Sequence, residues 1–135
     1  MNREALVKTA LGGLEKSYVP YSHFHVSAAL LCTDGSIYTG NNIENAAYSA
    51  TVCAERTAFF KAVSEGKRDF EAIAICGGAE GVVKDYCPPC GVCRQVMREF
   101  CGPDFKILLA RSEDDVKEYT LKQLLPESFG PDNLK

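Results

Sequence analysis

Apolar positions along this chain repeat with two different periods, and each period predicts a different element. Between residues 2 and 17 they recur three and four residues apart, which predicts a helix that a Gly-Gly pair weakens. Over residues 24–30 apolar side chains fall at every second position, which is the pattern of a strand. Asp34-Gly35 is a hairpin turn signal, so a second, antiparallel strand should begin near residue 37.

The rest of the chain predicts helices and strands in turn. We expect a helix over 51–66, with Thr51 near its N-cap and Gly66 past its end. Further elements are expected at 71–76 (strand), 90–100 (helix), 105–110 and 116–120 (strands) and 121–125 (short helix). This order predicts an α/β fold in one domain, residues 1–135. It would be a three-layer sandwich in which one mixed sheet of about five strands is flanked by helices on both faces.

Composition narrows the kind of partner this domain would bind. Of its 135 residues 24% are charged and 46% apolar, and the net charge is −3 with scattered lysines and arginines. Polynucleotide binding usually needs a basic face, and no apolar run is long enough to cross a membrane. Seven cysteines without a recognisable export signal indicate a reducing compartment. We therefore expect a cytoplasmic protein with a small, uncharged substrate and no nucleic-acid or membrane partner.

Candidate chemistry is concentrated in two short motifs, Cys53-Ala54-Glu55 and Pro89-Cys90-Gly91-Val92-Cys93. Three thiols could hold a zinc ion and leave one position open for water, as catalytic zinc sites do, while Glu55 stays free to move protons. Both motifs fall where helices should start, and helix N-termini favour thiolate over thiol. Three thiolates weaken zinc as a Lewis acid, so we expect Arg56 to donate hydrogen bonds to the sulfurs.

C-x-E followed by P-C-x-x-C is the known signature of zinc-dependent nucleobase deaminases. The chain resembles the short, homotetrameric cytidine deaminases from Phe24 through Asn42-Ile43-Glu44-Asn45 and both cysteine motifs to Leu124-Leu125-Pro126. The resemblance implies one Zn²⁺ per chain, whose bound hydroxide attacks C4 of cytidine or deoxycytidine. Glu55 would take the water proton, deliver it to N3 and help ammonia leave. The products would be uridine and deoxyuridine, the reaction of pyrimidine salvage.

The same resemblance assigns substrate contacts. Asn42 and Glu44 match ribose-binding residues, and a carboxylate there would repel a 5′-phosphate, which favours free nucleosides. Phe24 matches an aromatic that packs against the base, and the backbone of Ala54 would orient the pyrimidine. By the resemblance, a pair of aromatic residues would reach a neighbouring subunit's pocket, in a homotetramer with shared active sites. The expected substrate-binding residues are Phe24, Asn42, Ile43, Glu44, Tyr48, Ala54 and Phe129, with Tyr48 and Phe129 as the shared pair.

Several alternatives remain open from the residues alone. Cys87 could join the other three cysteines in a closed, non-catalytic zinc site. A deaminase could also act on a different cytosine-containing substrate. His23 and His25 stand at strand spacing but are expected to be surface or hydrogen-bonded histidines. Pro88 replaces the serine common in the family, which removes a hydroxyl but keeps the backbone carbonyl. The other cysteines, expected to be small buried residues, are Cys32, Cys76 and Cys101.

Overall fold

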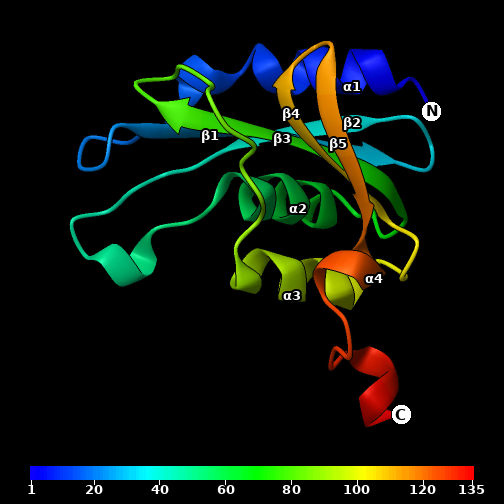
Figure 1. Ribbon diagram of the computed structural model, residues 1–135. Coiled ribbons are helices and arrows are strands. Elements are labelled where there is room, and N and C mark those ends of the chain that lie inside the picture. The colour runs from blue at the N-terminus through cyan, green and yellow to red at the C-terminus, as the bar shows by residue number, and fades with distance from the viewer.

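One mixed sheet separates two layers of helices in the computed structural model, which describes all 135 residues (Figure 1). The strand order is β2-β1-β3-β4-β5, and only β3 and β4 run parallel. The predicted three-layer α/β sandwich is confirmed. The strands are β1 (Phe24–Cys32), β2 (Ile37–Asn41), β3 (Phe70–Ala79), β4 (Lys106–Ser112) and β5 (Asp115–Thr120). The helices are α1 (Arg3–Leu11), α2 (Ala54–Ser64), α3 (Gly91–Phe100) and α4 (Leu121–Leu124).

Both faces of the central strands are buried. Successive strand residues point to opposite faces, so β3 contributes Ile73 and Ile75 to one core and Ala72 and Ala74 to the other. The core with the larger residues lies under α2 and α3 and is centred on Phe59. The other core packs against α1, which covers the opposite face alone (Figure 1). This double burial explains why the sequence of β3 is almost continuously apolar rather than alternating.

The topology gathers several chain segments at one end of the sheet. Helix α2 leads into the start of β3 and α3 follows its end, so both helices begin near the carboxyl end of that strand. Because β1 is antiparallel to β3, Phe24 lies opposite Ala79 at the same end. Strand β2 also ends there, with Asn41 opposite Ser27. The residues before α2 and α3 therefore meet the residues after β2 and before β1.

The start of α2 differs from the expectation. The helix begins at Ala54 with Cys53 as its N-cap, not near Thr51. Val52 and Ile43 exchange two backbone hydrogen bonds of 3.0 Å, which keep the chain extended up to Cys53. The Thr51 hydroxyl accepts from the amide of Asn45 rather than capping the helix. The first helix is also shorter than expected and ends at Leu11, and no helix combines the length and apolar composition needed to cross a bilayer.

Gly40 of β2 provides a test of how closely α2 packs on this strand. A Cβ at this position would lie 2.3 Å from the carbonyl oxygen of Ala54 and 2.5 Å from the amide of Ala58. We expect Gly40→Ala to lower the free energy of unfolding by about 2 kcal/mol or more, because the helix backbone must shift. Urea denaturation measures this. Gly102→Ala is the matched control, since a Cβ there meets nothing within 4 Å. Equal stabilities of the two variants would contradict the close packing of α2 on β2.

Candidate metal centre and active site

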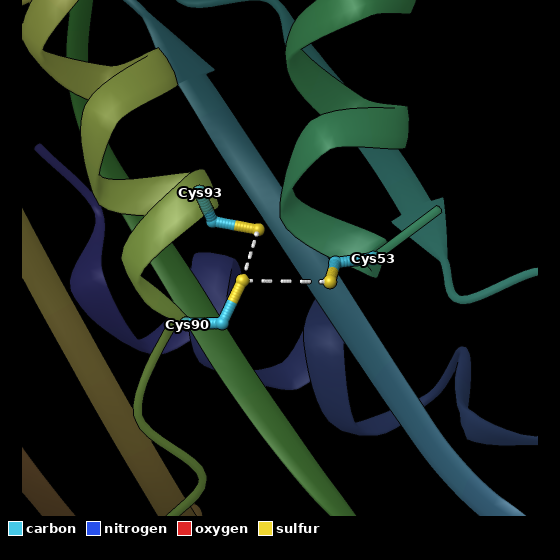
Figure 2. A group of neighbouring side chains, drawn as sticks. All are labelled: Cys53, Cys90 and Cys93. Atoms are coloured by element: carbon cyan, nitrogen blue, oxygen red, sulfur yellow. Dashed lines mark hydrogen bonds between the residues drawn. The ribbon is translucent and has the colours of Figure 1, made fainter. Parts of the chain in front are cut away.

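Three cysteine sulfurs meet where α2 and α3 begin (Figure 2). Cys53 is the N-cap of α2, Cys90 is the N-cap of α3, and Cys93 lies in the first turn of α3. The Sγ atoms of Cys53 and Cys90 are 3.7 Å apart, and those of Cys90 and Cys93 are 3.4 Å apart. All three sulfurs lie within 4.8 Å of one another. The structure thus brings together the three predicted metal ligands.

The spacing and the donor type both fit zinc. With zinc–sulfur bonds of 2.3 Å, tetrahedral coordination places sulfurs about 3.8 Å apart, close to the distances found here. Thiolate ligands favour zinc over hard ions such as magnesium. Cys87 is not a member of this group, and its Sγ lies in the space beside Gly77. The geometry therefore supports three protein ligands and an open fourth position, and it does not support the closed four-sulfur site.

Hydrogen bonds concentrate negative charge on one of these sulfurs. Nη2 of Arg56 donates to Sγ of Cys53 over 3.3 Å, which is the contact expected for this arginine. Hydrogen bonds from Cys93 and Arg56 lower the pKa of Cys53 to about 5 despite its burial. The pKa of Cys93 is raised, chiefly because it donates to Cys53. Without metal the cluster therefore keeps protons, and binding of a cation to all three thiolates would release them.

Glu55 lies in the first turn of α2 and is only 3% exposed. Its Oε1 is buried and has no hydrogen-bond partner. Burial, with a smaller contribution from the nearby charge of Cys53, raises its pKa to about 7. An unpaired buried carboxyl with such a pKa beside a metal cluster is typical of a catalytic acid or base. Near neutral pH this group can both accept and deliver a proton.

Asn42 and Glu44 hold the turn before β1 against the end of β2. Asn42 accepts a hydrogen bond from the amide of Val26 over 2.9 Å and donates to the carbonyl of Phe24 over 2.8 Å. Oε1 of Glu44 accepts from the amides of Tyr21 and Ser22, and Oε2 accepts from the Ser22 hydroxyl. The Ser22 bond also lowers the pKa of Glu44, which keeps that carboxylate charged.

Ser22 is a structural member of this region that sequence reasoning missed. Its hydroxyl links Glu44 to the amide of Phe24, which donates to it over 3.0 Å. The residue lies outside every motif, and its partner Glu44 is 22 positions away, so no local pattern marks it. Glu44 and Phe24, two candidate substrate-binding residues, are therefore joined through the side chain of Ser22, which the sequence gives no reason to select.

Three aromatic candidates are exposed, and one of them, Phe129, lies on a segment apart from the loop of Tyr48 (Figure 1). Phe24 is 40% exposed, Tyr48 is 73% exposed and Phe129 is 60% exposed. Tyr48 borders a hollow of about 380 Å³ lined by Tyr21, Ser22, Glu44, Tyr48 and Thr51. Figure 1 shows the C-terminal segment that carries Phe129 extending away from the loop of Tyr48. Of the remaining candidates, Ala54 is buried at the start of α2, and Ile43 is exposed and pairs with Val52.

The histidines and remaining thiols lie outside the cluster. Nδ1 of His25 is 2.8 Å from the carbonyl oxygen of Leu14, and His23 precedes β1 with a φ of 58°. The histidines therefore do not share one strand face, because only His25 lies in the strand. Cys32, Cys76 and Cys101 are buried as expected. Burial raises the pKa of both Cys76 and Cys101 to about 12, which makes them inert at neutral pH.

A family model for the cytidine and deoxycytidylate deaminase zinc-binding region matches residues 1–109. This chain belongs to that deaminase family. The match includes all three cysteines of the cluster and Glu55, so the predicted family is confirmed.

Relatives of this deaminase align over almost its whole length. A cytidine deaminase of Halalkalibacterium halodurans is 50% identical over 134 residues, covering 99% of this chain and 98% of the relative. A cytidine deaminase of Sporosarcina psychrophila is also 50% identical, with 99% and 96% coverage. The crystal structure of cytidine deaminase from Burkholderia pseudomallei has a TM-score of 0.87 at 42% identity and covers 96% of this chain and 100% of that one. The structure from Mycobacterium tuberculosis has a TM-score of 0.80 at 36% identity, with 97% and 99% coverage.

The contact between Arg56 and Cys53 predicts how metal affinity depends on pH. Removing the guanidinium should raise the pKa of Cys53 from about 5. Since zinc binds the thiolate, Arg56→Gln should weaken zinc binding at pH 6 more than at pH 8. Competition with a chelator measures the affinity, and thiolate absorbance near 240 nm measures the titration of the metal-free protein.

Arg68→Gln is the matched control, because Arg68 donates only to the backbone carbonyls of Val63 and Lys67. An Arg56→Gln titration that superposes on that of the wild type would show that this arginine does not stabilise the thiolate.

Proposed function

We propose that this protein hydrolyses cytidine and deoxycytidine to uridine and deoxyuridine with release of ammonia, as an enzyme of pyrimidine salvage. The observation that carries the proposal is the buried, unpaired carboxyl of Glu55 next to three clustered thiols. Relatives named cytidine deaminase, which share half of the residues of this chain, support the same reaction.

The donor set assigns the roles in hydrolysis. A zinc ion held by Cys53, Cys90 and Cys93 would lower the pKa of water to about 7 and so supply the nucleophile at neutral pH. Glu55 accepts the water proton and delivers it to N3 of the pyrimidine as oxygen adds to C4. The same carboxyl then takes the remaining proton from the hydroxyl on C4 and passes it to the amino group, so that the C4–N bond breaks, ammonia leaves and C4 becomes the carbonyl of uridine. Its pKa of about 7 suits both directions of transfer.

Substrate recognition would come from the end of the sheet beside the cluster. Phe24 would pack against the base, the backbone of Ala54 would orient the pyrimidine, and Ile43 would contact the substrate. Asn42 and Glu44 would bind ribose hydroxyls with the hydrogen-bonding capacity that their contacts within the chain leave over. Because Glu44 is held as an anion, it disfavours a 5′-phosphate. This charge favours nucleosides over nucleotides within a family whose description covers both.

A homotetramer with shared active sites is the assembly that best explains the exposed aromatics. Tyr48 and Phe129 present large aromatic surfaces that one chain leaves uncovered, and such residues typically anchor interfaces. We infer a cytoplasmic enzyme, because seven unpaired cysteines suit a reducing compartment. The single cluster of three thiols would hold one Zn²⁺ per chain.

Replacing the proposed proton carrier tests the reaction directly. Glu55→Gln keeps the shape of the side chain but removes proton transfer, which should lower turnover of cytidine by at least about 10²–10⁴-fold. Loss of ultraviolet absorbance on conversion to uridine follows the rate, and zinc content and melting temperature should match those of the wild type. Wild-type turnover in this variant would refute the assigned role of Glu55.

The charge of Glu44 should set the preference between nucleosides and nucleotides. Glu44→Gln should weaken binding of cytidine and lower the ratio of kcat/KM for cytidine to that for its 5′-phosphate by roughly tenfold or more, because a like-charge clash costs several kcal/mol. Glu99→Gln on the exposed side of α3 is the control for a change in net charge. An unchanged ratio would remove Glu44 from the discrimination of phosphate.

A further inference from the structure

The C-terminal segment is fastened to one face of α3. Nε2 of Gln95 donates to the carbonyl oxygen of Phe129 over 2.8 Å. One helical turn on, Nε of Arg98 donates to Oγ of Ser128 over 2.9 Å, and its Nη2 donates to Oδ1 of Asp132 over 2.6 Å. Two side chains of α3 therefore hold three residues of the segment that follows α4.

Gly130 completes this attachment, which we call the Arg98 clasp: Arg98 with Ser128, Gly130 and Asp132. Gly130 is buried, and a Cβ there would lie 2.3 Å from Cζ of Arg98. The guanidinium thus occupies the space where any other residue would carry a side chain. The Gly130 amide also donates to Oδ1 of Asn133 over 2.8 Å, which closes the last turn of the chain.

The ring of Phe129 is the exception in this segment. Its backbone carbonyl is bound, and its neighbours Ser128 and Gly130 contact Arg98, yet its side chain is 60% exposed. Fixing a backbone costs conformational entropy, and exposing a large aromatic ring gains nothing for a single chain. An ordered segment with an outward-facing aromatic ring is the arrangement of an anchor for another surface.

We propose that Arg98 is a positioning residue, whose clasp holds the C-terminal segment so that Phe129 enters the active site of a second copy of this chain. This inference rests on the proposed function and on its shared sites. A second copy is the fitting partner, because the segment leads away from the loop of Tyr48 in its own chain (Figure 1). The hollow beside Glu44, which Tyr21 borders, offers such a ring an aromatic surface.

Helix α3 would then serve two active sites at once. Its N-cap, Cys90, and Cys93 in its first turn belong to the candidate metal centre of its own chain. Its next turns carry Gln95 and Arg98, which place the ring donated to the partner. A shift of α3 would disturb both sites together.

A set of single and double variants tests the clasp. Arg98→Gln should raise KM for cytidine roughly tenfold while kcat changes little, and Phe129→Ala should do the same, as expected for loss of an interface anchor. The double variant should be no worse than Phe129→Ala alone, because Arg98 acts through that ring. Gly130→Ala, which displaces the guanidinium, is a second route to the same effect. Arg111→Gln is the control, since it removes an exposed arginine paired with Asp115.

The outcomes separate this inference from the proposed function. An active wild type with unchanged KM in Arg98→Gln and Gly130→Ala, or additive losses in the double variant, would overturn the clasp. A wild type that does not deaminate cytidine would instead overturn the function itself.

Mixed assemblies test whether the ring acts in a second copy. Chains carrying Glu55→Gln and chains carrying Arg98→Gln can be co-expressed with different tags and purified through both. Active sites in the Arg98→Gln chains should regain a low KM, because their partners still present a correctly placed Phe129. A KM that stays as high as in the pure Arg98→Gln protein would show that the ring serves its own chain.

Discussion

Mutual repulsion among three clustered thiolates is the constraint on which the rest of this structure depends. Cys53, Cys90 and Cys93 lie within 4.8 Å of one another, so all three can ionise together only where positive potential offsets their charge. The start of α2, the start of α3 and the guanidinium of Arg56 supply that potential. The sheet is arranged so that both helices begin at the carboxyl end of β3, and Phe24 and Asn42, which are proposed to bind substrate, lie at the same end of the sheet.

Close packing between α2 and β2 keeps this arrangement rigid. Gly40 lets the backbone of the helix approach the strand at Ala54 and Ala58, directly beside Cys53 and Glu55. Glu55 follows Ala54 in the same turn, and its own burial raises its pKa. The carboxyl proposed to carry protons therefore lies in a turn of the helix that packs unusually close to a strand.

The sequence predicted the residues of the candidate metal centre better than the hydrogen bonds that surround them. The cysteines and Glu55 could be found because they stand in short motifs, and the fold could be found because apolar periods persist over each element. The predicted start of α2 was wrong. Threonine is a common N-cap residue, but Val52, which follows Thr51, is held in an extended conformation by its hydrogen bonds to Ile43. Ser22 and Arg98 were missed, since their partners lie 22 to 34 positions away and arise only from the tertiary arrangement.

The crossover between the parallel strands β3 and β4 also fixes when the metal centre can form. Cys53 precedes β3, whereas Cys90 and Cys93 belong to the crossover, so the thiols meet only after a loop of roughly 40 residues has closed and α3 has docked on the sheet. During synthesis, the nascent chain therefore cannot assemble the complete ligand set from a local segment. Capture of a metal ion by all three thiols would therefore be a late event, after the surrounding architecture is in place.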